Sequence, residues 1–526
     1  MKSIGETLID QLEAHGTDVV FGIPGVHTVE LYRGLSSSNI RHVTPRHEQG
    51  AGFMADGYAR ISGKVGVAFV ITGPGLTNIL TPMGQARADS VPMLVVSSVN
   101  DSYNLGKGLG YLHELPDQLK MAQTVALSSS QITNAAELIP SLDNAYSILN
   151  NERGGPVHIE IPLDVMAHPF VQTHAKDIPT PKVNPFLNQI QTACDLLAKA
   201  QNPIIIAGGG AKRANDLITQ IAEHIHAPVV QTTNARGIMH KHPLCVPASP
   251  SLAAVRKLIQ QADIVLGIGT ELGPTDFDMY GDGGFPEIPN FIRIDLCPDQ
   301  LTRQPNSIGL CGRAEDILSE LLSSLPSQNT QSDGSKRAKT TRDAAYAELT
   351  GDMRAQIHFL NTVRDTYPNA IIVGDSTQPI YAGNLYYDHD RAGGWFNAAT
   401  GFGALGYGIP AAIGAAIADP AAQIICLTGD GGAQFTLPEL MTAKDEGLPI
   451  LFLVWNNNGY REIETSMVAA GVDVVGCDPN APDFKHVAAS CGMPYQSCIL
   501  DDGTLETILK SADIQNGPAM IEIKIT

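Results

Sequence analysis

The stretch from Gly429 to Gly459 reads GDGGAQFTLPELMTAKDEGLPILFLVWNNNG. The apolar run Ile424–Leu427 predicts a buried strand before it, PELMTAKDEG predicts a helix, and PILFLVW predicts a second buried strand. Asp430 stands in the glycine turn after the first strand, and Asn457 stands 27 residues later in the turn after the second. Because parallel strands end at one edge of a sheet, we expect both side chains to meet at one ligand.

Oxygen ligands in this pattern suit a hard dication such as Mg²⁺, with diphosphate oxygens and water completing its octahedron. Two polar loop ends without a ligand are the alternative, because a GDG turn alone is common. The whole segment resembles the metal-diphosphate motif of thiamine diphosphate enzymes. That resemblance implies that Asp430 and Asn457 bind Mg²⁺ through their side chains and Gly459 through its carbonyl. It places four neighbouring residues at the cofactor, namely Gly429, Gly431, Gly432 and Tyr460.

The segment TPRHEQGAGFMADGYAR surrounds Glu48. It resembles the segment with the catalytic glutamate in the superfamily of acetolactate synthases and 2-oxo acid decarboxylases. In that superfamily, the carboxyl group of the glutamate forms a hydrogen bond with a nitrogen of the cofactor's aminopyrimidine ring. This bond favours the imino tautomer, whose nitrogen removes the thiazolium proton. Taken alone, Glu48 reads as the cap of a helix that starts near Gln49. Because the cofactor motif follows further along the chain, we interpret Glu48 as catalytic.

Three further segments resemble cofactor or substrate loops of this superfamily. VGVAFVITGPGLTNIL matches its GPG loop, and IIVGDSTQPIYAG ends a strand in a polar turn. In AATGFGALGYGIPAAIGAAIA the resemblance makes Leu405 the wedge under the bent cofactor and the Gly403 carbonyl an acceptor for its amino group. A buried Gly/Ala-rich helix also explains that pattern. The other residues expected at cofactor or substrate are Thr72, Gly73, Asn78, Ser376, Thr377 and Gln378.

A length of 526 residues with 43% hydrophobic content predicts about three globular domains. Proline-rich and serine-rich seams at about 166–186 and 323–343 separate them. The resemblance covers essentially the whole chain and implies three doubly wound parallel-sheet α/β domains. They are a pyrimidine-binding domain at 1–165, a central Rossmann-like domain at 186–325 and a diphosphate-binding domain at 344–526.

The central segment carries a triple-glycine turn after IIIA that is a weak phosphate signal. The superfamily's acid-rich flavin motif is replaced by TELGPTDFDMYGDGG, so we expect no FAD. A net charge of −20 argues against nucleic-acid partners. No apolar run approaches the ~20 residues of a membrane span, and the first residues lack a signal-peptide core, so we expect a cytoplasmic protein without membrane partners.

Glu48 and Asp430 fall in different predicted domains. The superfamily builds each site between two chains, and the resemblance therefore implies a homodimer or homotetramer.

Within the superfamily, decarboxylases and carboligases differ in whether a proton or a second carbonyl reaches the acyl carbon. In GKGLGYLHELPDQ, His113 stands where synthases usually have Gln, and a histidine is a plausible proton donor. A structural loop residue is the alternative. The segments LHELPDQ, TELGPTDFD, IRIDLCPDQL and GDSTQPIYAGN resemble the decarboxylases that act on 5-guanidino-2-oxopentanoate.

A guanidinium substrate needs a carboxylate partner. Glu462 and Glu464 follow the metal turn on a predicted helix, where exposed surface acids are the alternative interpretation. Tyr111 and Glu114 are further candidates in the His113 loop. Asp276 and Asp278 belong to the central segment, and the sequence does not place them near the substrate.

The sequence thus predicts a decarboxylase that uses thiamine diphosphate and Mg²⁺ to convert a 2-oxo acid into an aldehyde and CO₂. Acetolactate synthase-type carboligation is the first alternative, and a hydroxyacyl-CoA lyase is a weaker one. A non-catalytic binding protein with the same fold is the alternative outside enzymes; the presence of Glu48 together with Asp430, Asn457 and Gly459 argues against it.

Overall fold

The computed structural model describes residues 1–151, 153–171, 187–277, 285–303, 308–326, 333–500 and 503–525. Asp278 and much of the two predicted seams lie outside these ranges. The chain forms two compact units. The first consists of Met1–Thr180, Gly401–Cys498 and Ala512–Thr526, and the second of Pro181–Thr400 and Ile499–Ser511. None of the helices in the described ranges has the length and apolar character that a bilayer crossing requires.

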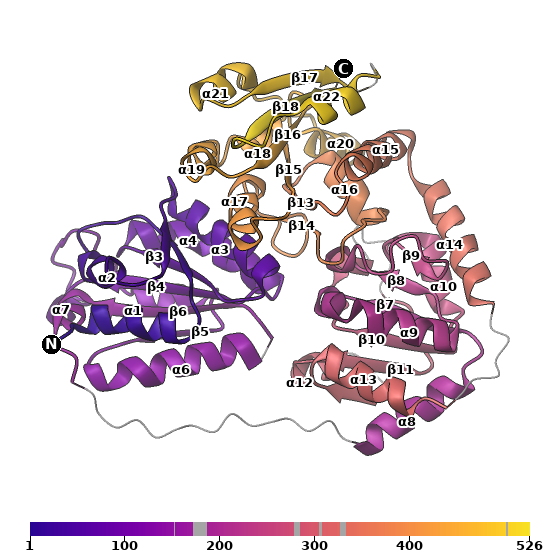
Figure 1. The fold of residues 1–526 in the computed structure, drawn as a ribbon, viewed down its shortest axis with the longest axis horizontal. Coiled ribbons are helices and arrows are strands. Elements are labelled where there is room, and N and C mark those ends of the chain that lie inside the picture. Colours follow the sequence, from indigo (N-terminus) through magenta and orange to yellow (C-terminus); the bar gives the residue numbers. More distant parts are fainter. Residues whose placement is uncertain are drawn as a thin grey trace. The chain divides into compact units, whose positions relative to one another are not determined.

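The first sheet has six strands in the order β2-β1-β3-β4-β6-β5 (Figure 1). Its strands are β1 Val19–Gly22, β2 Arg41–Val43, β3 Gly66–Val70, β4 Met93–Val99, β5 Ser128–Gln131 and β6 Pro156–Pro162. Its helices are α1 Ile4–Ala14, α2 Val29–Leu35, α3 Glu48–Ser62, α4 Pro74–Ala88, α5 Gln118–Gln123, α6 Ala135–Asn151 and α7 Leu163–Ala167. Neighbouring strands are parallel. Strands β3 and β4 are buried along their whole length, as the apolar sequence of β3 and the apolar first half of β4 predict.

The second sheet has the order β12-β11-β10-β7-β8-β9 and is also parallel. Its strands are β7 Pro203–Ala207, β8 Val229–Gln231, β9 Cys245–Val246, β10 Ile264–Ile268, β11 Phe291–Asp295 and β12 Ile308–Cys311. The helices are α8 Leu187–Lys199, α9 Asn215–Ile225, α10 Ala253–Gln260, α11 Pro274–Phe277, α12 Pro298–Thr302, α13 Ala314–Ser324 and α14 Gly334–Glu348. This is the six-strand central sheet that the sequence predicts.

The third sheet has the order β14-β13-β15-β16-β18-β17. Its strands are β13 Ile371–Gly374, β14 Trp395–Asn397, β15 Ile424–Gly429, β16 Ile450–Asn456, β17 Tyr495–Ile499 and β18 Ala519–Lys524. The helices are α15 Gly351–Thr366, α16 Gln378–Leu385, α17 Gly408–Ala418, α18 Asp430–Ala433, α19 Glu439–Asp445, α20 Arg461–Ala469, α21 Phe484–Ser490 and α22 Leu505–Ser511. Counted within each sheet, its strand order equals that of the first sheet. Three parallel α/β sheets confirm the predicted fold class.

The strand–helix–strand unit that the motif predicts is present. Strands β15 and β16 are adjacent and parallel, with Ile424 opposite Ile450 and Gly429 opposite Trp455. Asp430 begins α18 directly after β15, and Asn457 follows the last residue of β16. Both residues therefore leave the sheet at the same edge.

Helices α3 and α17 pack backbone against backbone. A Cβ atom on Gly57 would lie 2.0 Å from the Ala411 carbonyl oxygen, and one on Gly414 would lie 1.9 Å from the Met54 carbonyl oxygen. Every residue of α17 from Gly408 to Ile417 is buried. The Gly/Ala-rich segment is therefore a buried helix, and its small residues permit this approach.

A buried ionic cluster also joins these helices. The Arg60 guanidinium donates to Asp56 and Asp89, each at 2.6 Å, and the Tyr407 hydroxyl donates to Asp56. Burial raises the pKa of the Asp56 carboxyl, while the Arg60 charge opposes that rise. Removing one member would leave a buried charge without its partner, so this cluster fixes how α3 and α17 pack.

In the second unit, the triple-glycine turn packs against the turn after β10. A Cβ atom on Gly208 would lie 2.3 Å from the Gly269 carbonyl oxygen, and one on Gly269, whose φ is +56°, would lie 2.7 Å from Gly210. Close backbone packing therefore accounts for these glycines.

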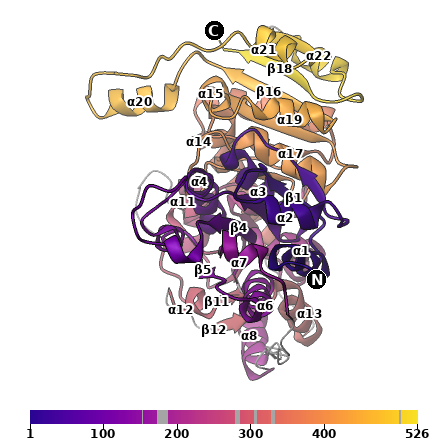
Figure 2. The same ribbon diagram turned by 90° about the vertical axis from the view of Figure 1, so that its left-hand side faces the viewer.

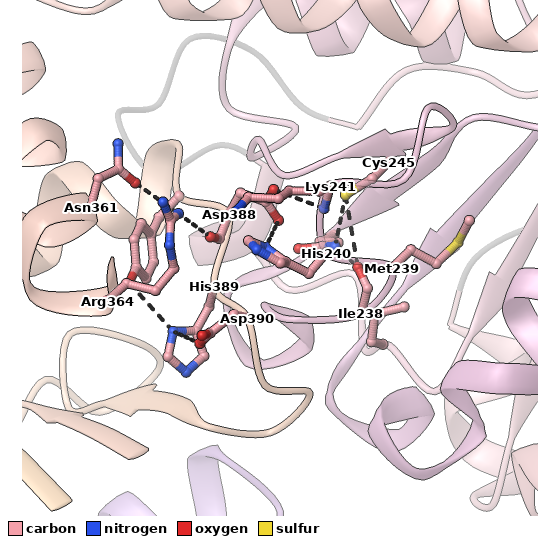
Figure 3. Close-up of polar contacts among 12 residues, drawn as sticks. Ile238, Met239, His240, Lys241, Cys245, Asn361, Arg364, Asp388, His389 and Asp390 are labelled. Carbon is pink, nitrogen blue, oxygen red and sulfur yellow. Dashed lines mark hydrogen bonds and ion pairs between the residues drawn. The ribbon is translucent and has the colours of Figure 1, made fainter. Parts of the chain in front are cut away.

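Residues on both sides of the second predicted seam meet around Asp388 (Figure 3). The Asp388 carboxylate lies 3.1 Å from the His240 imidazole and accepts from the Lys241 backbone N–H at 3.1 Å. Arg364 donates to the Asp388 carbonyl oxygen at 2.6 Å and to the Asn361 side chain at 2.9 Å. These contacts join the turn before β9 to helix α15 within this unit.

Candidate functional site

Glu48 is the first residue of helix α3. His47 caps this helix, because its Nδ1 atom accepts from the Gln49 backbone N–H at 3.1 Å. The Asn78 side-chain amide donates to Glu48 Oε2 at 2.9 Å. The structure therefore joins two residues that the sequence places at the cofactor, one on α3 and one on α4.

The GPG turn before α4 is held by side chains from neighbouring strands and loops. The backbone N–H of Thr72 donates to Ser98 Oγ at 3.1 Å, and that of Gly73 donates to Gln118 Oε1 at 2.8 Å. Gly73 has a φ of +67°, and a Cβ atom there would lie 2.5 Å from the His113 carbonyl oxygen. Glycine is therefore required both for backbone conformation and for the approach of the His113 loop.

Gln118 is a site residue that the sequence reasoning missed. Its amide nitrogen donates to the Ser98 carbonyl oxygen at 2.9 Å and to Glu160 Oε2 at 3.1 Å. Burial raises the pKa of the Glu160 carboxyl, against the opposing effect of bonds from Gln131 and Gln118. This buried network fixes the position of the GPG turn through the bond between Gln118 and the Gly73 N–H.

His113 lies beside a second histidine, His27. Their ring centroids are 5.1 Å apart with an edge-on geometry, and neither Nδ1 atom has a hydrogen-bond partner within the described part of the chain. His113 has a φ of +62°, and His27 is only 8% exposed. Burial, followed by the nearby His113, lowers the pKa of His27, while Asp101 opposes the change. The two imidazoles form a pair next to the GPG turn.

One sequence signal could have identified His27. It lies in the loop after β1, and the first sheet reverses its strand order between β1 and β3. Ligands of doubly wound sheets bind outside the carboxyl ends of the strands at such a point. His27 follows one of these strands, and Thr72 and Gly73 follow the other.

The turns that carry Asp430 and Asn457 lie side by side. The Asp430 side chain is buried, and its Oδ1 atom accepts from the Asn457 backbone N–H at 3.4 Å. Burial raises the pKa of the Asp430 carboxyl, although backbone N–H groups of Asn457 and its neighbours act in the opposite direction. The Asp430 carboxylate and the Asn457 backbone thus meet at the ends of two adjacent strands.

Cys477 holds the turn after Asn457 in place. Its carbonyl oxygen accepts from the Tyr460 N–H at 2.7 Å, and a Cβ atom on Gly459 would lie 2.4 Å from the same oxygen. A Cβ atom on Gly431 would lie 2.4 Å from the Tyr460 ring. The glycines let the two turns and the tyrosine ring approach closely. A buried carboxylate on a glycine-lined turn fits the Mg²⁺ and diphosphate that the motif predicts.

The loop with Gly403 and Leu405 lies on helix α4. The Ala404 N–H donates to Gln85 Oε1 at 3.3 Å, and the Phe402 ring packs where Gly84 has no side chain. Gly403 is exposed with a φ of +72°, and Leu405 is partly buried. This loop therefore contacts the helix that carries Asn78.

Ser376, Thr377 and Gln378 belong to the second unit, at the end of β13 and the start of α16. The Ser376 N–H donates to Asp375 Oδ1 at 2.8 Å, and Thr377 precedes the first residue of α16. The structure confirms the predicted polar turn after the strand.

The two candidate acids of α20 differ in their surroundings. Helix α20 buries none of its residues and stands away from strands β16 and β18 (Figure 2). Glu464 forms an ion pair with Arg461, whereas the Glu462 carboxylate makes no such contact within the described residues. In the His113 loop, Glu114 accepts from the backbone N–H groups of residues 108–111, so it shapes the loop itself. Tyr111 is 44% exposed.

Three family models match this chain, all from thiamine pyrophosphate enzymes. The N-terminal binding domain matches residues 2–121, the central domain 190–321 and the C-terminal binding domain 375–523. A solved structure from Mycobacterium smegmatis, described as that of "a putative thiamin diphosphate-dependent enzyme", has the same fold. Its TM-score is 0.84 at 22% identity, over 100% of this chain and 99% of the other.

Two curated relatives extend over nearly the full length. The chain is 40% identical to the "Probable 2-ketoarginine decarboxylase" of Pseudomonas aeruginosa, over 99% of this chain and 93% of the relative. It is 29% identical to the acetolactate synthase large subunit of Corynebacterium glutamicum, over 98% of this chain and 86% of the relative. The resemblance inferred from the motifs is thus confirmed, and the chain belongs to the thiamine pyrophosphate enzyme family.

Proposed function

We propose that this protein is a decarboxylase that depends on thiamine diphosphate and Mg²⁺ and converts a 2-oxo acid to an aldehyde and CO₂. The observation that carries the proposal is the contact between Glu48 and Asn78, beside a GPG turn that packs against His113. This arrangement provides a carboxyl group for the cofactor and an imidazole for the substrate.

The residues divide into three groups by role. Asp430, Asn457 and Gly459 would hold Mg²⁺, and the neighbouring glycines would admit the diphosphate. Glu48 would hold a proton at the cofactor's aminopyrimidine ring, with Asn78 orienting its carboxyl group. When bound, thiamine diphosphate supplies a carbon nucleophile and an electron sink for the departing CO₂. The remaining cofactor contacts would come from Thr72, Gly73, Ser376, Thr377, Gln378, Gly403, Leu405, Gly429, Gly431, Gly432 and Tyr460.

His113 would supply the proton that the acyl carbon takes up after CO₂ leaves. Its edge-on contact with the buried His27 restrains the ring, and its Nδ1 atom is not engaged by the described part of the chain. A proton donor at this position favours aldehyde release over addition to a second carbonyl.

For the substrate, the relative named for 2-ketoarginine supports a 2-oxo acid with a guanidino group, 5-guanidino-2-oxopentanoate. A guanidinium needs an acid that is not already paired. Glu462 fits this requirement better than Glu464, which pairs with Arg461. We assign Glu462 to the guanidino end of the substrate.

We also propose a homodimer or homotetramer with sites between chains. Exposed large apolar residues gather in the segments that carry the site residues. They are Val26, Val29, Leu109, Tyr111 and Leu112 near the histidine pair, and Phe402, Phe435, Ile463, Val468, Val472, Val474 and Val475 in the segments around the metal turn and α20. Apolar surface of this kind is typical of protein interfaces.

The test is to incubate the enzyme, reconstituted with thiamine diphosphate and Mg²⁺, with pyruvate, benzoylformate, branched-chain 2-oxo acids and 5-guanidino-2-oxopentanoate. The proposal predicts CO₂ and 4-guanidinobutanal from the guanidino acid. The similarity to acetolactate synthases supports carboligation as the second candidate. Acetolactate from pyruvate, with no aldehyde from the guanidino acid, would establish that second candidate instead.

A further inference from the structure

The buried Glu439 carboxylate accepts hydrogen bonds from the backbone just before Glu48. Glu439 is the first residue of α19, and its side chain is 0% exposed. Its Oε1 atom accepts from the backbone N–H groups of Arg46 at 2.9 Å and His47 at 3.0 Å. Its Oε2 atom accepts from the Arg46 N–H at 3.1 Å and from the Thr442 hydroxyl at 2.7 Å.

These bonds involve the two residues that directly precede helix α3. The first N–H groups of a helix and those of the residues before it have no partner within the helix, and the helix dipole favours a negative charge there. Burial raises the pKa of the Glu439 carboxyl, while bonds from Thr442 and the two backbone N–H groups oppose that rise. Hydrogen bonds from N–H groups to an ionised acceptor are about twice as strong as neutral ones. The carboxylate therefore fixes the path of the chain into α3.

Gly50 provides a second, independent observation. A Cβ atom at this position would lie 2.3 Å from Glu439 Oε1 and 2.6 Å from its carboxyl carbon. Gly50 lies within α3, where alanine would favour the helix by about 1 kcal/mol. Glycine at this position thus leaves room for the Glu439 carboxylate.

We propose that Glu439 is a positioning residue for Glu48: through Arg46 and His47 it holds the first turn of α3 so that the Glu48 carboxyl group keeps its place beside Asn78. This inference rests on the proposed role of Glu48. It assigns a function to a helix that follows the metal turn but carries none of the predicted site residues. The same carboxylate links the segment before α3 to α19 within the first unit.

The test compares Glu439→Gln and Gly50→Ala with the control Asp445→Asn. The Gln side chain keeps one oxygen for the Arg46 and His47 N–H groups but loses the charge and the second acceptor. The Ala variant keeps Glu439 and pushes its carboxylate away. Asp445 also contacts Arg46, but through an exposed ion pair with its side chain, so the control removes a contact on the same residue without touching its backbone bonds.

The first readout is amide hydrogen exchange of the peptide covering residues 44–50 in the protein without cofactor. We expect exchange to be about tenfold faster in both test variants and unchanged in the control. The second readout is steady-state kinetics, where we expect kcat to fall about 100-fold with KM nearly unchanged, because small misplacement of a reacting group costs that much.

Glu48→Gln separates this inference from the proposed function. If Glu48→Gln keeps full turnover, the proposed role of Glu48 fails. If Glu48→Gln is inactive while Glu439→Gln has the same amide hydrogen exchange and the same kcat as the wild type, the positioning role of Glu439 is wrong. If Glu439→Gln does not fold, the Gly50→Ala variant decides by the same two readouts.

Discussion

The side-chain amide of Asn78 donates a hydrogen bond of 2.9 Å to the Glu48 carboxylate. Glu48 begins α3, and Asn78 lies in the second turn of α4, so the bond links the N-terminal parts of two helices. Both residues follow loops at the carboxyl edge of the first sheet. A carboxyl group that must hold a proton in a defined direction requires such a partner.

Glu48→Gln should abolish most activity because an amide cannot exchange the proton. We expect kcat to fall by about 10³-fold, within the range for loss of a general acid-base group, while the melting temperature stays within about 1 °C. Asn78→Ala should lower kcat by about tenfold, since it removes the hydrogen bond that orients the Glu48 carboxyl group. Steady-state kinetics and thermal unfolding measure both. Turnover by Glu48→Gln at the wild-type rate would contradict the role of this carboxyl group.

Asp430→Asn should raise the stability of the cofactor-free protein and abolish its stabilisation by the cofactor. Burial raises the folded-state pKa of Asp430, so its ionised form costs stability at neutral pH, and that cost disappears as the pH falls through the raised pKa. Asparagine avoids this cost, and we expect the cofactor-free variant to melt about 2 °C higher. Mg²⁺ with thiamine diphosphate should stabilise the wild type but not the variant. Equal stabilisation of both by the cofactor would argue against Asp430 as a metal ligand.

Much of this site follows from sequence because its residues stand at strand ends within regular α/β units. The motif around Asp430 and Asn457 predicts two adjacent parallel strands, and β15 and β16 form them. His27 and Glu439 were not predicted. Their partners, His113 and the segment before Glu48, are 86 and about 390 residues away in the chain. The place of His27 after β1 marks its loop, but nothing local in the sequence marks its contact with His113 or the contact of Glu439 with the segment before Glu48, because only tertiary packing creates them.

Glu462→Gln should raise the KM for 5-guanidino-2-oxopentanoate about tenfold, because a charged hydrogen-bond acceptor for the guanidinium is lost. The KM for an apolar 2-oxo acid should not change. Glu464→Gln is the matched control, since it lies on the same helix but pairs with Arg461. If both variants shift the KM equally, or neither does, Glu462 does not recognise the guanidino group.

His158→Gln should make the protein less sensitive to acid. His158 is fully buried, and its ring nitrogens lie 2.8 Å from Ser97 Oγ and 2.7 Å from Ser129 Oγ. Burial lowers its pKa to about 3. The unfolded chain binds this proton below about pH 6.5, so stability is lost as the pH falls from there towards 3.

Between pH 6.5 and 4.5 the loss from His158 alone should reach about 2.5 kcal/mol. Thermal unfolding at a series of pH values measures it. The melting temperature of His158→Gln should fall less over this range than that of the wild type, whereas the exposed control His358→Gln should follow the wild type. Parallel curves for all three proteins would mean that His158 is not protonated on unfolding.

Mixing two inactive variants tests whether each site uses two chains. If Glu48 of one chain serves the Asp430 turn of another, a mixed dimer of Glu48→Gln and Asp430→Asn has one site with both changes and one with neither. An equal mixture, allowed to exchange subunits, should then recover about a quarter of wild-type activity, because half of the dimers are mixed and each has one intact site. If each site lies within one chain, every site in the mixture carries one change, and activity stays at the level of the single variants. Sedimentation of the same mixture confirms that dimers are present, so an inactive mixture of exchanged dimers places Glu48 and Asp430 of the same chain in one site.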